Sequence, residues 1–199
     1  MDRKTCFIVC PIGEEGSEIR RKSDDLLEFI IEPICNQKGY DIVRADKILN
    51  NDRIDDSILK YLNEAELVIA DVTQNNANVF YELGFRTATG KPVIQIAEDG
   101  TKLPFDIQNI RTHFYNIDNT RKTQEFKQKL LQIIYAVEQN EEKKKKEENQ
   151  KQINEVFTSD FQRSMSSVLL TEMVNDPEKF ERIMKLFDDS KKAKSNSTT

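Results

Sequence analysis

Two carboxylates and several amides lie where an apolar segment gives way to a helical one. Asp71 follows the apolar run 67–70, and Glu82 comes one helical turn after Asn78. A fixed anion stabilises the positive charge that develops at the anomeric carbon when a glycosidic bond breaks. We therefore predict that Glu82 attacks or stabilises a sugar cation and that Asp71 holds a sugar hydroxyl. These two residues are the catalytic candidates.

Simpler roles for both carboxylates are also consistent with the spacing. Glu82 and Arg86 are separated by one helical turn and would form an ordinary ion pair on a helix surface. Asp71 would accept hydrogen bonds from the N–H groups of its own turn around Thr73, as aspartates at strand ends commonly do. The spacing leaves these alternatives open.

The segment 11–17 is a candidate binding loop between an apolar run and a helical segment. Its candidate substrate-binding residues are Pro11, Ile12, Gly13, Gly16 and Ser17. Backbone N–H groups of such a loop, with the positive end of the following helix, can bind a phosphate or a sugar. The glycine spacing matches neither a dinucleotide-binding fingerprint nor a P-loop, so the glycines could also serve only to make the turn.

Polar side chains elsewhere at the same expected sheet edge complete the set of substrate-binding candidates. These are Asp46, Asp55, Asn76, Asn78 and Tyr81. The asparagines would contact hydroxyl groups or only shape the loop and cap the helix. Asp55, with Asp56, would supply a second acidic group or form a solvated helix start. Of Phe80 and Tyr81, one is expected in the core and the other stacked on a base.

Short apolar runs rich in β-branched residues alternate with amphipathic stretches, which is typical of a parallel sheet covered by helices. We predict an α/β fold of the flavodoxin or Rossmann-like kind: a doubly wound, five-stranded parallel sheet of order 2-1-3-4-5 with a C-terminal helical extension. The expected strands are residues 5–10, 40–44, 67–70, 93–97 and 114–117, and the expected helices are 17–37, 54–63, 78–89 and 123–137. This order reverses between the first and third strands, so the segments 11–17 and 71–78 should form one pocket.

The chain changes character after the last of these helices. The run 141–148 contains only glutamates and lysines, whose spacing suits a solvated helix or a hinge, and apolar residues then recur at helical spacing. Such a stripe cannot be buried by one or two helices alone. It should therefore dock on the main domain or on another subunit, and we favour self-association. We predict an α/β domain at 1–140, a helical extension at 141–190 that forms a homo-oligomer, and a disordered tail at 191–199.

Composition limits the classes of function. The 199-residue chain is 37% hydrophobic, enough for one main domain, and its net charge of −5 comes from interleaved acids and bases, which disfavours a nucleic-acid partner. The absence of a long apolar run or a secretory segment predicts a cytoplasmic protein without membrane contact. The three cysteines are expected to be buried and reduced. A single histidine, His113, argues against histidine-rich zinc sites and the usual serine triad, so no metal or cofactor is predicted.

Three motifs together resemble a known superfamily. They are Phe7-Ile-Val-Cys-Pro11-Ile-Gly13, Ala70-Asp71-Val-Thr-Gln-Asn-Asn-Ala-Asn78-Val-Phe-Tyr-Glu82-Leu-Gly84 and Gly90-Lys91-Pro92-Val-Ile. Over about residues 5–117 the chain resembles the nucleoside 2-deoxyribosyltransferase-like superfamily, which is structurally related to TIR domains and whose looser members are described as TIR-like nucleotide-binding proteins. The resemblance implies that Glu82, in the Tyr-Glu-Leu-Gly motif, attacks the anomeric carbon.

One departure and one likeness shape the expected substrate. Relatives that cleave deoxynucleotides place an aspartate where Ile58 stands here, so a carboxylate that holds the sugar must come from Asp55, Asp56 or elsewhere. TIR enzymes, which cleave the nicotinamide bond of NAD, also use a glutamate early in a corresponding helix. The polar loop 45–53 stands where TIR domains carry a mobile loop.

We therefore expect an enzyme that cleaves or transfers the N-glycosidic bond of a nucleoside, a nucleotide or NAD. One alternative is a sensor or scaffold that binds a nucleotide without cutting it. The other is a TIR-like, NAD-cleaving defence effector that is active only when assembled.

Overall fold

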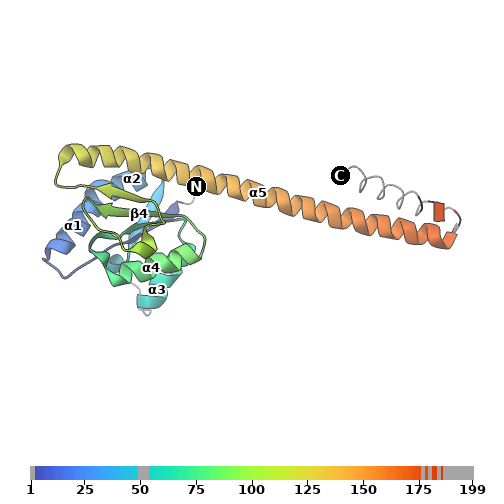
Figure 1. Ribbon diagram of the computed structural model, residues 1–199, viewed down its shortest axis with the longest axis horizontal. Coiled ribbons are helices and arrows are strands. Elements are labelled where there is room, and N and C mark those ends of the chain that lie inside the picture. The colour runs from blue at the N-terminus through green and yellow to red at the C-terminus, as the bar shows by residue number, and fades with distance from the viewer. Residues whose placement is uncertain (1–2, 49–53, 176–177, 179–180, 183–184, 186–199) are drawn as a thin grey trace. The chain divides into compact units, whose positions relative to one another are not determined.

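Five parallel strands form the central sheet of the described chain, in the order β2-β1-β3-β4-β5 (Figure 1). The computed structural model describes residues 3–48, 54–175, 178, 181–182 and 185, and it describes their side chains except at 54, 55 and 155–175. The predicted α/β fold and strand order are confirmed.

The elements lie close to their predicted positions. The strands are β1 (Lys4–Val9), β2 (Tyr40–Arg44), β3 (Leu67–Asp71), β4 (Val93–Glu98) and β5 (Thr112–Tyr115). The helices are α1 (Glu18–Leu26), α2 (Glu32–Gln37), α3 (Ile54–Glu64), α4 (Ala77–Ala88) and α5 (Thr120–Asn175). The short turns are the π-helical η1 (Leu27–Ile31) and the 3-10 turns η2 (Ala45–Lys47), η3 (Thr73–Asn75) and η4 (Phe105–Ile107).

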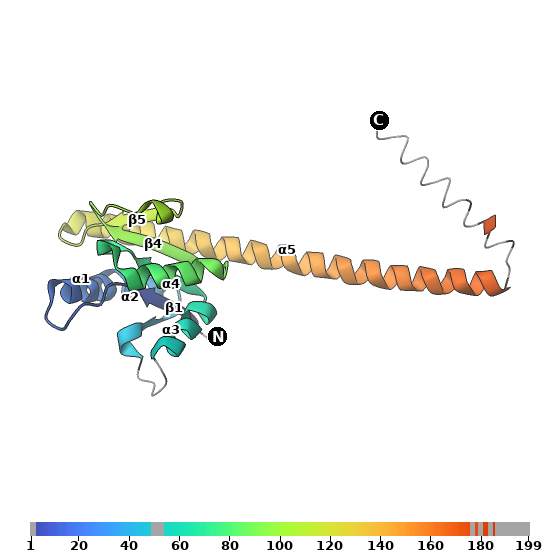
Figure 2. The same cartoon turned by 60° about the horizontal axis from the view of Figure 1, so that its bottom comes forward.

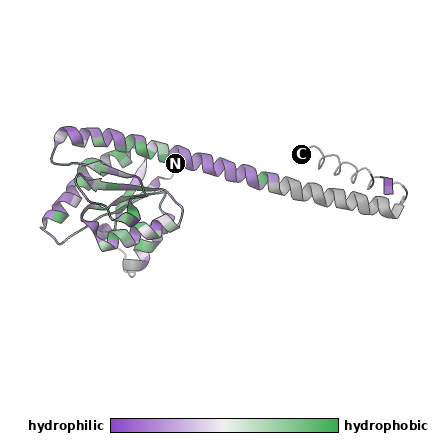
Figure 3. Ribbon diagram, in the orientation of Figure 1, coloured by the Kyte–Doolittle hydropathy of each residue, from purple (hydrophilic) through white to green (hydrophobic). Residues whose placement is uncertain are grey.

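Apolar side chains cover both faces of the sheet, and hydrophobic residues occur both in the strands and in the helices that pack on them (Figure 3). Because side chains alternate along a strand, Ile8 and Ile69 face α1, α2 and the first part of α5, whereas Val9 and Val68 face α3 and α4. All of β3 is buried, as expected for a central strand with helices on both faces. The rigid sheet therefore fixes the ends of β1 and β3, where the predicted site lies.

The helix expected at 17–37 contains a π-helical turn that the sequence pattern did not predict. This turn, η1, is wider than an α-helical turn, and it separates α1 from α2. Leu27, Ile30 and Ile31 are all buried there. The wider turn thus keeps a dense apolar run on the face that covers the sheet.

β5 begins earlier than predicted, at Thr112. Thr112 and His113 pair with Gln95 and Ile96 of β4, so the ladder extends through polar residues at the sheet edge. Figure 2 shows β5 at this edge, beside the first part of α5, where the rings of Tyr115 and Phe126 lie 5.7 Å apart. Polar residues in an edge strand lack the apolar pattern on which the sequence prediction depended.

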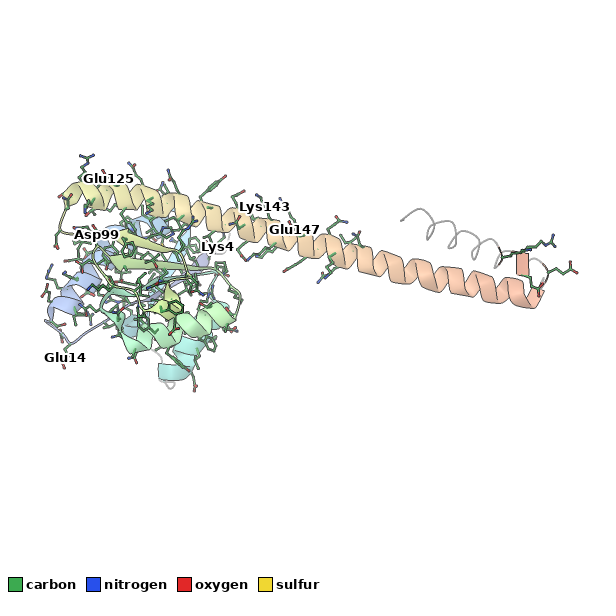
Figure 4. The ribbon with its side chains drawn as sticks, in the orientation of Figure 1. Lys4, Glu14, Asp99, Glu125, Lys143 and Glu147 are labelled. Carbon is green, nitrogen blue, oxygen red and sulfur yellow. The ribbon has the colours of Figure 1, made fainter. Side chains whose placement is uncertain are left out.

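The chain divides into two units, Met1–Glu141 and Glu142–Thr199, and α5 contains residues of both. The charged run 141–148 is helical, and the exposed side chains of Lys143 and Glu147 point outward from α5 (Figure 4). Ile153, in the predicted apolar stripe, is exposed. The segment 191–199 lies outside the described residues, and self-association through the extension stays a prediction.

Two further properties concern the described residues. Cys6, Cys10 and Cys35 are buried and free, as the sequence predicted. No helix in the described part of the chain is both long enough and apolar enough to cross a lipid bilayer.

Candidate functional site

A cavity of about 350 Å³ opens where β1 ends and α4 begins. The strand order reverses between β1 and β3, which is where open α/β sheets bind ligands, and the volume falls within the range of small-molecule sites. The cavity is lined by Ile8, Val9, Cys10, Ile12, Gly13, Ala45, Asp46, Ile58, Asn76, Asn78, Val79 and Glu82. The sequence candidates that meet here are Ile12, Gly13, Asp46, Asn76, Asn78 and Glu82.

Glu82 contributes a partly buried carboxylate to this cavity. Val79 and Leu83 of the same helix are buried against the sheet, so Glu82 lies beside the apolar face of α4. Within the described part of the chain its carboxylate has no hydrogen-bond or ion-pair partner, and desolvation alone raises the pKa of Glu82 to about 7. Near neutral pH the carboxylate is therefore poised between its two protonation states, as suits a catalytic acid, base or nucleophile.

Arg86 is not the partner of Glu82. Its side chain is 0% exposed and donates to the backbone carbonyls of Leu62 (2.8 Å), Ala65 (2.8 Å) and Pro92 (3.0 and 3.2 Å). These bonds join α4 to the end of α3 and to the segment before β4. The alternative in which Glu82 only forms a surface ion pair with Arg86 is therefore wrong.

The loop between β3 and α4 fixes where Glu82 lies. The side-chain oxygen of Asn76 accepts hydrogen bonds from the N–H groups of Asn78 (2.9 Å) and Val79 (3.3 Å) and so caps α4. Just before it, Gln74 and Asn75 have left-handed backbone with φ of 65° and 55°. The cap uses the oxygen of Asn76 and leaves its NH₂ group, together with the side chain of Asn78, available to a ligand.

Asp71 is buried under the turn and does not line the cavity. Its Oδ1 accepts hydrogen bonds from the N–H (3.0 Å) and the hydroxyl of Thr73, and its Oδ2 accepts one from the Tyr115 hydroxyl (2.8 Å). Burial raises the pKa of Asp71 even though these bonds favour its ionised form. Because Oδ1 holds the turn and Oδ2 is bonded to Tyr115 of β5, the geometry favours the structural alternative for Asp71 over contact with a sugar.

The predicted binding loop contributes only part of its residues. Ile12 and Gly13 line the cavity, whereas Pro11, Gly16 and Ser17 do not. Gly13 has a φ of +64°, and a Cβ there would lie 2.8 Å from the Ser17 hydroxyl, so glycine is required. The Ser17 hydroxyl accepts a hydrogen bond from the N–H of Arg20 (3.1 Å) and caps α1. Ser17 thus serves the helix rather than the cavity.

An ion-pair network around the buried side chain of Arg44 borders the cavity at Asp46. Arg44, the last residue of β2, is 1% exposed and donates to both oxygens of Asp46 (2.6 and 2.8 Å) and to Asp24 (2.6 Å). Arg20 contacts the same two carboxylates, each at 2.9 Å. Burial alone would raise the pKa of Asp46, but the bonds and charges of the arginines outweigh it and lower that pKa. Asp46 is therefore ionised at neutral pH.

The wall that α3 contributes is apolar. Ile58 lines the cavity, while Asp56 is exposed and the side chain of Asp55 is not among those that the structure describes. Of the two neighbouring aromatic residues, Phe80 packs on the core, as predicted for one of them. Tyr81 is 68% exposed and does not line the cavity. Among the described side chains, Asp46 and Glu82 are thus the two carboxylates of the cavity wall.

Comparison with curated proteins returns the 5-hydroxymethyl-dUMP N-hydrolases of Mus musculus and Rattus norvegicus, each 31% identical over 78 residues, or 39% of this chain. The resemblance predicted from the motifs is confirmed. The match covers 42% of the mouse protein and 45% of the rat protein, so the chain spans less than half the length of these relatives. No family model matches the chain.

Comparison with solved structures returns proteins of low sequence identity. The CMP N-glycosidase BcmB of Clostridium botulinum is 17% identical, with a TM-score of 0.45 over 64% of this chain and 98% of that one. The 2-deoxyribosyltransferase of Bacillus psychrosaccharolyticus is 12% identical, with a TM-score of 0.46 over 62% and 90%. The enzyme of that name from Leishmania mexicana is 14% identical, with a TM-score of 0.39 over 51% and 75%.

Proposed function

We propose that this chain cleaves or transfers the N-glycosidic bond of a nucleoside or nucleotide, with the Glu82 carboxylate at the anomeric carbon. The observation that carries the proposal is a partly buried carboxylate without a partner among the described residues, in a cavity at the reversal of strand order. The curated relatives, named as N-hydrolases of a nucleotide, support it.

In the proposed step, the bond between C1′ of the sugar and the base nitrogen breaks. The base keeps the electron pair and takes up a proton from solvent, while positive charge develops on the sugar. Ionised Glu82 either bonds to C1′ or stabilises that charge. Water or a second base then attacks C1′ and releases a proton to solvent, and where a C1′–Glu82 bond had formed, that bond breaks and returns the carboxylate. The apolar side chains of Ile58 and Val79 keep the local dielectric low, which strengthens the attraction between the carboxylate and the sugar cation. Asn76 and Asn78 orient the sugar hydroxyls.

NAD is a second candidate substrate. Ala45 and Asp46 belong to the segment that corresponds to the mobile loop of TIR domains, and both line the cavity. In NAD, a C1′–N bond joins a ribose to the nicotinamide ring. NAD bound in this cavity would bring the same kind of bond to Glu82.

Incubating the protein with nucleosides, 5′-nucleotides, their 2′-deoxy forms and NAD tests the proposal. We expect chromatography to show free base or nicotinamide from at least one compound, at a rate proportional to protein concentration. Binding measured by calorimetry without any release would instead identify the protein as a nucleotide sensor. Neither binding nor release of any compound would contradict both readings.

A further inference from the structure

We propose that Tyr115 is a positioning residue for the candidate site, because its hydroxyl holds Asp71 and so fixes the turn between β3 and α4 (residues 72–76). Tyr115 ends β5 and is 5% exposed, and β4 lies between β5 and β3. Asn76, the last residue of this turn, lines the cavity. The effect of Tyr115 on turnover rests on the proposed function, whereas its effect on the turn does not.

Asp71 is a buried carboxylate whose three hydrogen bonds all come from neutral donors. Oδ1 accepts from the N–H and the hydroxyl of Thr73, and Oδ2 accepts from the Tyr115 hydroxyl at 2.8 Å. Burial, with the nearby charge of Asp71, raises the pKa of Tyr115, so its hydroxyl stays protonated and donates. The Tyr115 ring packs on Phe126 of α5, which holds the hydroxyl in place. Loss of this hydroxyl would leave Oδ2 without its donor, which is costly for a buried charge.

Thr73 is the fixed point near the start of the turn. Its hydroxyl, which donates to the buried carboxylate, also accepts a hydrogen bond from the N–H of Glu98 at the end of β4 (2.9 Å). Gln74 follows with left-handed backbone (φ of 65°), a conformation that a residue of this type keeps only where the surrounding structure enforces it. Release of Thr73 would therefore let Gln74 relax and shift Asn76, which lies two residues further on.

The cap of α4 offers a direct measure of whether Asn76 stays in place. The side-chain oxygen of Asn76 accepts hydrogen bonds from the N–H groups of Asn78 and Val79. A bonded N–H exchanges its hydrogen with water only when its bond opens. Exchange at these two amides therefore measures how often Asn76 leaves its position, and the measurement needs no substrate.

Tyr115→Phe tests the inference, because phenylalanine keeps the ring on Phe126 and removes only the hydroxyl. Hydrogen exchange is followed by NMR, and the rates at Asn78 and Val79 are divided by those of the central β1–β3 ladder, so that a general loss of stability cancels. We expect this ratio to rise at least about tenfold, the factor that a lost hydrogen bond to a buried charge corresponds to. With a substrate found among the nucleosides, nucleotides and NAD, kcat/KM should fall at least about tenfold.

Tyr40→Phe is the matched control. Tyr40 is also buried and its hydroxyl also donates to a carboxylate, that of Glu138 (3.2 Å), but it lies at the start of β2. We expect this variant to keep the exchange ratio and kcat/KM within about twofold of wild type. Circular dichroism identifies a temperature at which all variants are folded, and both measurements are made there.

Two substitutions of Thr73 test the same connection independently, and they decide the matter if Tyr115→Phe does not fold. Thr73→Ser keeps the hydroxyl and should stay within about threefold of wild type, whereas Thr73→Val keeps the shape and should reproduce Tyr115→Phe.

Equal exchange ratios in Tyr115→Phe and Tyr40→Phe, or equal behaviour of the two Thr73 variants, would overturn the inference. A selective rise in exchange without a fall in kcat/KM would also overturn it, because the turn would then not position the site. If the wild-type protein turns over no compound, the proposed function fails, and the exchange ratios alone decide whether Tyr115 holds the turn.

Discussion

Glu82→Gln is expected to lower base release at least about 100-fold while the protein stays folded. Glutamine keeps the size of the side chain but has no negative charge to bond to C1′ or to stabilise the sugar cation. The rate is measured by chromatography of the released base under saturating substrate. Glu64→Gln is the matched control because Glu64 is exposed in the last turn of α3, and this variant should keep the wild-type rate. Wild-type turnover in Glu82→Gln would refute the assignment.

The stability of the same variant separates loss of charge from loss of fold. Burial raises the pKa of Glu82 from 4.5 to about 7, so between these values the folded state retains a proton that the unfolded state has released. The contribution of Glu82 to stability is therefore fully present below about pH 4.5 and is lost as pH rises through about 7. Glutamine never ionises, so urea denaturation should show the variant equal to wild type at pH 4 and more stable at pH 8. Because the carboxylate is partly exposed, we expect a difference on the order of 1 kcal/mol.

Arg86→Met is expected to destabilise the protein by about 3 kcal/mol, with a fall in Tm of roughly 10 °C. Methionine fills a similar volume but removes four hydrogen bonds and leaves the carbonyls of Leu62, Ala65 and Pro92 without their buried donor. Part of the loss is offset because the variant no longer has to remove water from a charged guanidinium on folding. The same cost of desolvation lowers the pKa of Arg86 in the wild-type protein. Thermal and urea denaturation measure the effect.

Arg21→Met is the matched control for this substitution. Arg21 lies on the surface of α1, where it pairs with Asp25 at 2.9 Å, and exposed pairs of this kind contribute little. We expect its stability to stay within about 0.5 kcal/mol of wild type. Equal stability of the two arginine variants would show that the carbonyl contacts of Arg86 do not hold α3, α4 and β4 together.

β1, β3 and β4 could be predicted because each is a largely apolar run between polar segments. β3 follows this pattern closely, since a buried strand requires apolar side chains on both faces. β5 was misplaced by its polar edge residues, and η1 has no periodicity that separates it from an α-helix. Tertiary pairing and packing decide both features, and neither leaves a local mark in the sequence.

The site residues that could be predicted are those whose place in the chain, directly after a buried strand, brings them to the cavity. Glu82 and Asn76 follow a buried strand at the reversal of strand order, so topology alone brings them to the cavity. Arg44 was missed because its partner Asp24 lies far away in the sequence. A charged residue that ends an apolar strand beside Asp46 is the signal that could have identified it. Likewise, the partners of Arg86 are backbone carbonyls, which no side-chain pattern reveals.

A crystal structure of the Glu82→Gln protein with its bound substrate tests the central claim most directly. The account predicts that the nucleotide occupies the cavity between β1 and α4 with C1′ about 3–3.5 Å from the side-chain oxygen of residue 82, the separation at which reacting atoms are poised for attack. A nucleotide bound elsewhere on the chain, or bound here with its anomeric carbon turned away from residue 82, would contradict it.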